Sequence, residues 1–363
     1  MGIHLFVPML HRHDAVGEHT LALRDRLVRA GVRSTIYSET PDPATVDQTR
    51  HYLDYEAESE PGDVLVYQFA TASAIAGWLA GRPEPVVVNY HSITPPQFFA
   101  PWNNGITRLQ VGAQLELGVL APRAALGIAV SRFDEDELLR AGCTATVVIP
   151  VANVAVPPVE PDPAVAERIG ADEAGPGHRW LSVGRLAPNK AHHQTFAALF
   201  VARSTSDPGA RLTLVGPPSE PAYAAALHRY AAALGLSGAV EFVTGISDGA
   251  LAAHYRCADV LVMLSDHEGF GVPLVEAMAH GLPVVAFDAG AVGEVLGDAG
   301  VLLAAKHPRH VAGAVAALMA DADERGRLAA AGRARFDALH LDQAADRLVD
   351  AVRGLADPAP AAR

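Results

Sequence analysis

Short apolar runs alternate with longer amphipathic segments along most of the chain, and this alternation strongly constrains the fold. Runs rich in Val, Ile and Leu, without polar alternation, are typical of parallel strands buried on both faces. In the first half we place strands at 3–7, 34–37, 64–67, 86–89, 128–130 and 146–149. In the second half we place them at 180–183, 211–215, 240–243, 260–264, 284–286 and 300–303. The pattern predicts an α/β protein with two parallel sheets.

A segment rich in Pro and Gly separates the two series of strands. It contains Pro157, Pro158, Pro161 and Pro163 and ends in Gly175-Pro176-Gly177, a composition that interrupts regular structure and commonly marks a linker. We therefore predict one domain at 1–156, a linker at 157–177 and a second domain at 178–341. Apolar residues near the end recur at helical spacing, which predicts an amphipathic helix over 342–356. For this helix we consider packing back onto the first domain.

The composition excludes several classes of function. The 363 residues include 28 Lys and Arg against 41 Asp and Glu, a net charge of −13, and a surface of that sign repels phosphate backbones, so we expect no nucleic-acid partner. The first residues lack a basic stretch followed by a long apolar one, and no later stretch supplies about 18 uninterrupted apolar residues. We therefore expect a cytoplasmic protein. Cys143 and Cys257 lie far apart without a metal-ligand pattern.

The junction after the predicted strand at 260–264 carries the strongest chemical signal. It reads Ser-Asp-His-Glu268-Gly269-Phe270-Gly271-Val272-Pro-Leu-Val-Glu276, which predicts a glycine loop that leads into a helix start. The free N–H groups of such a helix start form an anion site suited to phosphate. Glu268 and Glu276 would repel a phosphate, so they are better placed to accept hydrogen bonds from neutral hydroxyls such as those of a sugar or a ribose.

Two other strand ends carry polar residues. After the strand at 180–183 comes Gly184-Arg185, followed by Lys190, and a guanidinium and an ammonium on one loop can together neutralise a diphosphate. His91 follows the strand at 86–89 and can exchange hydrogen bonds with a substrate at neutral pH. The carboxyl ends of parallel strands are where ligands bind in such sheets.

Several other patterns point away from a metal or a resident cofactor. His11, His13 and His19 lie near the first predicted loop, but their spacing matches no metal site, and we favour solvated loop histidines. The chain has no GxGxxG, since Leu274 stands at the third glycine position, and no GxxxxGK[ST]. We expect no metal and no cofactor, and a nicotinamide dinucleotide fold is not supported.

These residues together resemble a known family, the retaining nucleotide-sugar glycosyltransferases of the glycogen-synthase-like type, family four. The segment Glu268–Glu276 is similar to the E-x7-E motif of that family, and Gly184-Arg185 with Lys190 is similar to its diphosphate-binding pair. His91 stands where the family has its active-site histidine, and Gly17 stands in the family's glycine-containing first loop. The resemblance implies the GT-B fold, with two facing Rossmann-like domains, an acceptor-side domain first and a nucleotide-sugar-binding domain second.

The resemblance also implies roles for these residues. His91, Glu268, Arg185 and Lys190 would be catalytic. Gly17, Gly184, Arg185, Lys190, Gly269, Phe270, Gly271, Val272 and Glu276 would bind the donor. The activity implied is transfer of a hexose-type sugar from a nucleoside diphosphate sugar to a hydroxyl acceptor, which could be a sugar, a lipid or a small-molecule aglycone. Transfer would retain the anomeric configuration through a metal-independent front-face mechanism, with the departing diphosphate stabilised by fixed cations.

Two alternatives to this function stay open at this point: a nucleotide-sugar epimerase of the same fold, and a catalytically silent nucleotide-sugar-binding protein. The apolar loop Pro95–Trp102 poses a separate question. It could contact an apolar acceptor or the periphery of a membrane, but we favour inward packing of its aromatic side chains.

Overall fold

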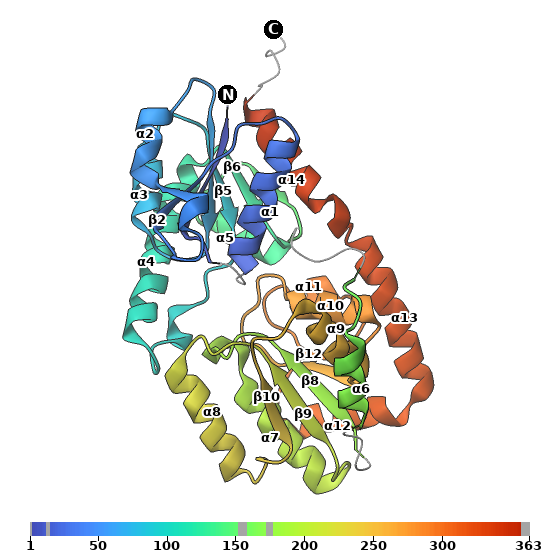
Figure 1. Ribbon diagram of the computed structural model, residues 1–363. Coiled ribbons are helices and arrows are strands. Elements are labelled where there is room, and N and C mark those ends of the chain that lie inside the picture. Colours follow the sequence, from blue (N-terminus) through green and yellow to red (C-terminus); the bar gives the residue numbers. More distant parts are fainter. Residues whose placement is uncertain (1, 12–14, 152–157, 172–176, 357–363) are drawn as a thin grey trace. The chain divides into compact units, whose positions relative to one another are not determined.

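The computed structural model describes residues 2–11, 15–151, 158–171 and 177–356. Its chain divides into two compact units (Figure 1). The first comprises residues 1–97, 104–153 and 340–363, and the second comprises residues 98–103 and 154–339. The chain therefore passes between the units several times, and each unit is described by itself.

The first unit is built on a seven-stranded parallel sheet in the order β3-β2-β1-β4-β5-β6-β7. Its strands are β1 (Ile3–Met9), β2 (Ile36–Thr40), β3 (Thr49–His51), β4 (Val64–Phe69), β5 (Val86–Tyr90), β6 (Leu126–Ala129) and β7 (Thr146–Val148). Its helices are α1 (Ala15–Arg29), α2 (Tyr55–Glu58), α3 (Ala74–Ala80), α4 (Asn104–Leu120), α5 (Arg132–Arg140) and α14 (Leu341–Ala356).

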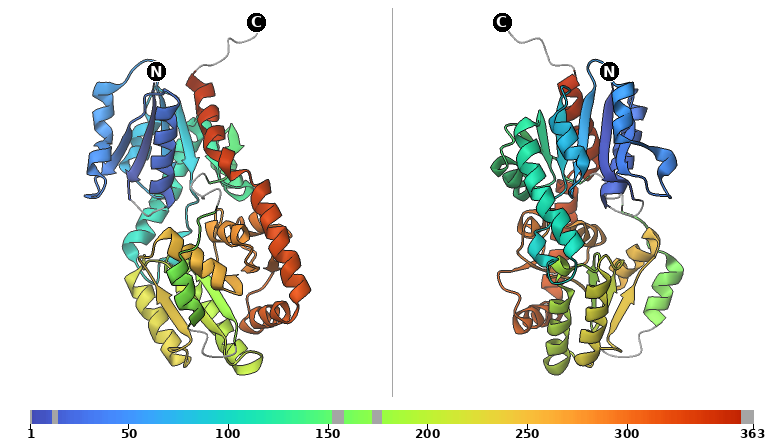
Figure 2. Two further views of the ribbon diagram at one scale, coloured as in Figure 1. Left: turned by 45° about the vertical axis from the view of Figure 1, so that its right-hand side comes forward. Right: turned by 90° about the vertical axis from the view of Figure 1, so that its left-hand side faces the viewer.

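Helices cover both faces of this sheet (Figures 1 and 2). Successive side chains of a strand point to opposite faces, so Val64 and Val66 of β4 pack with α1 and α14, whereas Leu65 and Tyr67 pack with α3, α4 and α5. Burial on both faces explains why these strands are continuously apolar in sequence. The same alternation decides which face each polar residue near a strand end will join.

The second unit contains a six-stranded parallel sheet in the order β10-β9-β8-β11-β12-β13. Its strands are β8 (Arg179–Val183), β9 (Arg211–Val215), β10 (Val240–Val243), β11 (Val260–Met263), β12 (Val284–Phe287) and β13 (Val301–Leu303). Its helices are α6 (Pro163–Ala171), α7 (His192–Thr205), α8 (Pro221–Ala233), α9 (Asp248–Cys257), α10 (Val272–His280), α11 (Val292–Leu296), α12 (Pro308–Ala320) and α13 (Ala322–Ala338). The predicted fold class, α/β with two parallel sheets, is confirmed.

All twelve predicted strands are present, with ends displaced by at most a few residues. The sequence reading missed β3, a three-residue edge strand of Thr, Arg and His that pairs with β2. An edge strand is half open to solvent and needs no apolar run, so periodicity gives no sign of it. The predicted C-terminal helix corresponds to α14, whose Leu348 and Val352 pack in the core of the first unit.

The segment predicted as a linker contains regular structure. Within it, α6 begins at Pro163, a favoured first helical residue, and the side chain of Asp162 accepts hydrogen bonds from the N–H groups of Ala164 and Val165 at 2.9 and 3.2 Å. The Asp162 N–H donates to the carbonyl of Gly249, in the first turn of α9, at 2.9 Å. The prolines read as interruptions therefore include one that starts a helix.

The apolar loop after β5 packs inward. Phe99 is 7% exposed, and Trp102 packs against the core of the second unit, where its ring lies edge-on to Tyr223 at 5.1 Å. The Asn103 amide donates to Glu220 Oε2 at 2.8 Å. Residues 98–103 thus belong to the second unit although they lie between two elements of the first. The favoured alternative for this loop, inward packing, is the observed one.

Candidate functional site

The candidate site lies at the carboxyl ends of β8 and β11 in the second unit. These two strands are neighbours in the sheet, but the chain continues from β8 towards one edge and from β11 towards the other. Such a change of direction leaves a crevice outside the strand ends, and ligands of open α/β sheets bind there. The two loops that carry the predicted motifs follow these two strands.

The loop after β8 has a tightly specified backbone. Gly184 has φ +147°, and a Cβ added at Gly216 would lie 2.1 Å from the Gly184 carbonyl oxygen, so both positions require glycine. Ala191 is left-handed, with φ +50°, at the start of α7. A non-glycine residue in this conformation is under strain that functional sites commonly hold. The loop thereby fixes the position of Lys190.

Lys190 and Glu268 form an ion pair between the two loops. Lys190 Nζ donates to both carboxylate oxygens of Glu268, at 2.7 and 2.8 Å, and Glu268 is only 6% exposed. Neighbouring backbone links reinforce the pair, since the Asp266 N–H donates to the Asn189 carbonyl at 2.7 Å. The structure therefore brings together two predicted site residues that are 78 positions apart in the chain.

The glycine loop after Glu268 leads directly into α10. Gly271 is left-handed, with φ +86°, and stands at the N-terminal cap of that helix, with Pro273 in its first turn. Gly290 approaches the loop so closely that an added Cβ would lie 2.2 Å from the Glu268 carbonyl oxygen, which accepts from Ala291 N–H at 2.9 Å. At the start of α10 the Val272 N–H is the donor available to an anion, because Pro273 has no N–H and the Leu274 N–H donates to the Gly271 carbonyl at 2.9 Å.

Glu276 lies one turn into α10 and is largely enclosed. Its Oε2 accepts a hydrogen bond from the Tyr255 hydroxyl at 2.7 Å. Burial raises the pKa of Glu276 to about 7, although the Tyr255 hydrogen bond lowers it. A carboxyl group with this pKa is partly ionised near neutral pH. A ligand that donates hydrogen bonds to it would favour the ionised form.

The Arg185 side chain reaches solvent, whereas its backbone carbonyl is hydrogen-bonded to a buried histidine. Its side chain is exposed, and its carbonyl lies 3.1 Å from Nε2 of the buried His192. Burial lowers the pKa of His192 to about 4, so the ring is neutral and its Nε2–H donates to that carbonyl. Gly269 and Phe270 complete the glycine loop, with Phe270 6% exposed.

Sequence reasoning missed Lys306, which lies beyond β13. Its Nζ donates to Asp266 Oδ1 at 2.5 Å and to the Leu264 carbonyl at 2.9 Å, and it lies 4.8 Å from the centre of the Phe287 ring. Lys306 therefore ties the ends of β11 and β12 to the segment after β13. A signal was available, because Lys190 and Lys306 are the only two lysines in the sequence.

In the first unit, His91 joins a buried cluster of uncharged side chains. His91 Nε2 lies 2.7 Å from Gln68 Oε1, and Asn89 links Gln68 to His19. Burial, with His19 as a lesser cause, holds the pKa of His91 well below its usual value, so the ring is neutral. Sequence reasoning selected His91 but not Gln68 or Asn89, because a polar residue inside a buried strand gives no sign of its partners.

Gly17 lies in α1, close to the backbone of the preceding loop. A Cβ added there would lie 1.8 Å from the His11 carbonyl oxygen, which gives the glycine a packing reason of its own. His11 pairs with Asp42, and His19 contacts Asn89, so these two histidines do not converge. His13 lies outside the described residues. The donor-binding role expected of Gly17 stays a prediction.

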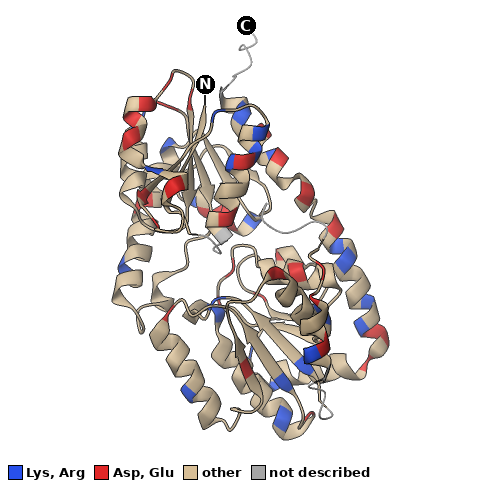
Figure 3. Cartoon of the chain, in the orientation of Figure 1, with Lys and Arg blue, Asp and Glu red and all other residues tan. Residues whose placement is uncertain are grey.

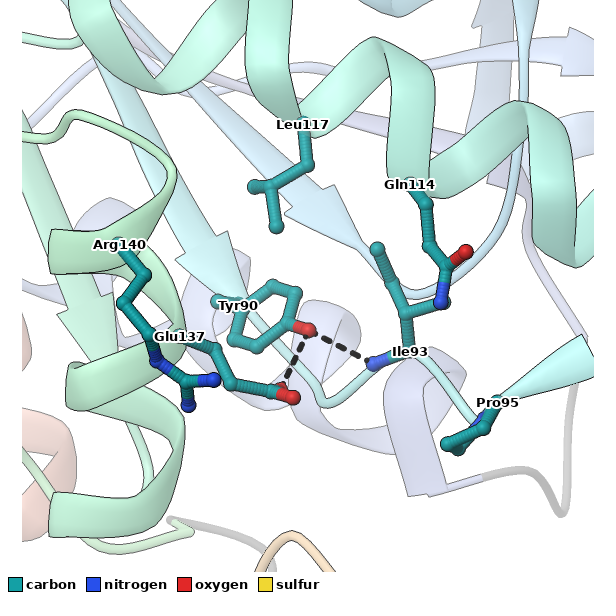
Figure 4. A pocket seen from close by; sticks show the side chains of 7 residues that line it. All are labelled: Tyr90, Ile93, Pro95, Gln114, Leu117, Glu137 and Arg140. Carbon is teal, nitrogen blue, oxygen red and sulfur yellow. Dashed lines mark hydrogen bonds between the residues drawn. The ribbon is translucent and has the colours of Figure 1, made fainter.

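A small pocket lies on the opposite face of the first sheet (Figure 4). Tyr90, the last residue of β5, donates its hydroxyl hydrogen to Glu137 Oε2 at 2.8 Å and accepts from the Ile93 N–H at 3.0 Å. Burial raises the pKa of Glu137. The Tyr90 hydroxyl thus connects α5 to the loop that follows His91 and fixes the course of that loop.

Charged residues of both signs are mixed over the helices and loops, as along α13 (Figure 3). Among the residues that the structure describes, no helix is both long and apolar enough to cross a bilayer.

Residues 173–335 match the family model "Glycosyl transferases group 1". This match includes every predicted site residue of the second unit. Over this domain, the chain is similar to the group 1 glycosyltransferases. The family resemblance seen in the sequence is thereby confirmed, whereas the roles of the individual motif residues stay predictions.

Curated relatives match about half of the chain. A D-inositol 3-phosphate glycosyltransferase of Geodermatophilus obscurus is 35% identical over 191 residues, which cover 50% of this chain and 41% of the relative. A GDP-mannose-dependent alpha-(1-6)-phosphatidylinositol monomannoside mannosyltransferase of Mycobacterium tuberculosis is 33% identical over 205 residues, which cover 53% of this chain and 52% of the relative. The matched region thus spans about half the length of these relatives.

Solved structures match nearly the whole chain and show the fold. Sucrose-phosphate synthase from Thermosynechococcus elongatus superposes with a TM-score of 0.78 at 20% identity, covering 98% of this chain and 99% of that one. HepE of Anabaena in complex with UDP-glucose has a TM-score of 0.74 at 20% identity, covering 96% and 99%. The chain shares the GT-B fold with these structures.

Proposed function

We propose that this protein is a retaining glycosyltransferase that moves a hexose-type sugar from a nucleoside diphosphate sugar to a hydroxyl acceptor without a metal. The observation that carries the proposal is the meeting of Lys190 and Glu268, 2.7 Å apart, beside the N-terminal end of α10 at the switch point of the second sheet. A cation, an acceptor of hydroxyl hydrogen bonds and the positive end of a helix suit the phosphate and sugar of such a donor.

The charges of the site support a metal-free mechanism. The leaving nucleoside diphosphate gains negative charge as the glycosidic bond breaks, and fixed positive groups stabilise that charge in the transition state. Lys190, the exposed Arg185 side chain and the N-terminal end of α10 supply them. Glu268 would hold sugar hydroxyls, Glu276 the ribose, and His91 the sugar near the reacting carbon. A front-face displacement, with the leaving phosphate assisting the acceptor, retains the anomeric configuration.

The relatives narrow the first substrates to test. One neighbour was solved with UDP-glucose, one relative is GDP-mannose-dependent, and both curated relatives are named for acceptors that carry inositol. We therefore expect a uridine or guanosine diphosphate hexose as donor, and a polyol or inositol-containing hydroxyl compound as acceptor.

The test is a thermal-shift and slow-hydrolysis screen against uridine, guanosine and adenosine diphosphate sugars, with and without a metal chelator. We expect stabilisation and slow release of the diphosphate with one base, unchanged by the chelator, and, once a hydroxyl acceptor is added, an α-linked product from an α-linked donor. Inversion at the anomeric carbon or loss of turnover with chelator would contradict the mechanism. Deuterium uptake into the donor sugar without acceptor would indicate an epimerase, and stabilisation without turnover would indicate a silent binder.

A further inference from the structure

Four uncharged side chains form one hydrogen-bonded chain at the carboxyl ends of β4 and β5. His91 Nε2 lies 2.7 Å from Gln68 Oε1, Asn89 Nδ2 lies 2.8 Å from the same oxygen, and Asn89 Nδ2 lies 2.9 Å from His19 Nε2. Gln68 and Asn89 lie on the face of the sheet that α1 covers, which is how His19 of α1 reaches them. The His19 and His91 rings also meet edge-on at 5.1 Å.

This hydrogen-bonded chain of side chains is deeply buried. Gln68 is 0%, Asn89 1% and His19 3% exposed. Among the described residues, Gln68 Nε2, Asn89 Oδ1 and His19 Nδ1 have no hydrogen-bond partner. The hydrogen bonds within the cluster therefore hold the remaining polar atoms of these side chains, and breaking one of them would leave a further buried polar group unpaired.

The donors and acceptors in the chain determine one another. Gln68 Oε1 can only accept, so His91 donates from Nε2–H, and Asn89 donates from Nδ2 both to Gln68 and to His19 Nε2. His91 then carries no proton on Nδ1, which is left as an acceptor. Turning a single amide would set two donors or two oxygens against each other. Only a turn of both amides together satisfies the chain again, and that arrangement places the His91 proton on Nδ1.

We propose that His19, Asn89 and Gln68 are positioning residues that hold His91 in the Nε2–H tautomer and so present its Nδ1 as the acceptor for a sugar hydroxyl. The inference rests on the proposed function for the identity of the ligand, but the tautomer of His91 depends only on the four hydrogen-bonded side chains. It identifies His19 as a residue that acts through three hydrogen bonds rather than by touching the substrate.

Two substitutions of equal size and charge separate this role from a merely structural one. Gln68→Glu puts a carboxylate, which only accepts, where Gln68 already accepts, so the Nε2–H tautomer of His91 is kept. Asn89→Asp puts the same group where the chain needs a donor. The introduced carboxylate can only accept, so the Gln68 amide must turn and donate to it from Nε2. The second N–H of the turned Gln68 amide then donates to His91 Nε2. His91 Nε2 must therefore be unprotonated, and the ring proton moves to Nδ1. Both substitutions add one negative charge to the same buried cluster.

The primary measurement is the nitrogen-15 spectrum of histidine-labelled protein at pH 8, with His91→Gln used to assign the ring. We expect His91 protonated at Nε2 in the wild type and in Gln68→Glu, and at Nδ1 in Asn89→Asp. Donor hydrolysis should fall about ten- to a hundredfold in kcat for Asn89→Asp, with a small change in KM, and by less than about threefold for Gln68→Glu. A wild-type His91 protonated at Nδ1, or the same tautomer in both variants, overturns the proposal.

A third variant covers the case in which Asn89→Asp does not fold. Gln68→Leu removes the oxygen that accepts from His91 Nε2–H, so no side chain of the cluster then selects a tautomer and the spectrum should show His91 in both. A single unchanged tautomer in Gln68→Leu also overturns the proposal. If the tautomer responds as expected but the wild type turns over no sugar donor, the positioning chain stands and the proposed function fails, so the two failures are distinguishable.

Discussion

The two units place chemically opposite groups at the carboxyl ends of neighbouring strands in similar parallel sheets. In the second unit, the ends of β8 and β11 carry the ion pair of Lys190 with Glu268 beside a helix N-terminus. In the first unit, the ends of β4 and β5 carry a neutral chain of amides and imidazoles. The βα framework fixes where polar groups gather, whereas the residue types decide their charge. From this comparison we expect the diphosphate to bind at the second unit and neutral hydroxyls to bind at the first.

Lys190→Ala tests the charged side of this comparison and should have the largest effect. The change removes a cation from the leaving group and leaves the buried Glu268 carboxylate without its partner, so kcat/KM for the donor should fall by about a hundredfold or more. Lys306→Ala is the matched control, since Lys306 pairs with Asp266 of the same loop. Equal losses in the two variants, measured by donor turnover, would contradict the assignment of the diphosphate to Lys190.

Glu276→Gln tests the pH dependence of the second unit. The pKa of Glu276 is raised to about 7 in the fold, so the folded protein binds a proton that the unfolded chain releases near pH 4.5. This group's stabilisation is complete below pH 4.5 and is lost as the pH rises through 7, about 1 to 3 kcal/mol in the free energy of unfolding.

Denaturant unfolding at pH 4.5 and pH 7.5 measures this contribution. In Glu276→Gln the free energy of unfolding should fall less between pH 4.5 and pH 7.5 than in the wild type. In Glu241→Gln, which changes an exposed position of β10, it should fall as much as in the wild type. An unchanged pH dependence in Glu276→Gln would contradict the role of burial. The neutral histidines of the first unit should add no dependence of turnover between pH 6 and 8, because burial lowers the pKa of His19 to about 4 and that of His91 well below its usual value.

Gly17→Ala separates packing from donor binding in the first unit. The added Cβ would lie 1.8 Å from the His11 carbonyl oxygen, so the start of α1 must shift, and the free energy of unfolding should fall by about 2 kcal/mol. Gly77→Ala is the control, because its Cβ would meet open space in α3 and should stabilise that helix by about 0.5 kcal/mol or more. A destabilised Gly17→Ala with unchanged donor affinity would leave Gly17 a packing role alone.

Tyr90→Phe should have the smallest effect. It removes a buried hydroxyl that donates to Glu137 and accepts from the Ile93 N–H, which should lower the free energy of unfolding by about 1 to 2 kcal/mol. Tyr230→Phe, at an exposed ring, should change nothing measurable. A loss of turnover in Tyr90→Phe larger than its loss of stability would show that the loop after His91 needs this anchor for function.

Much of the fold could be predicted because buried parallel strands carry their signature locally. All twelve apolar runs correspond to strands, and the motif around Glu268 does mark a glycine loop and a helix start. The elements that the sequence did not predict are weakly apolar or lack a local pattern. The edge strand β3 has no apolar run, and α6 begins at a proline within a segment rich in helix-breaking residues.

The partners of the site residues could not be predicted from the sequence. Sequence reasoning selected Lys190, Glu268 and His91, but it could not pair Lys190 with Glu268, place Lys306 on the Asp266 loop, or find Gln68 and Asn89 behind His91. Residue type and position relative to a strand are local properties, which the sequence by itself determined. Which side chains meet depends on strand order and on the face to which each strand residue points, and those are settled only when distant strands pair in one sheet.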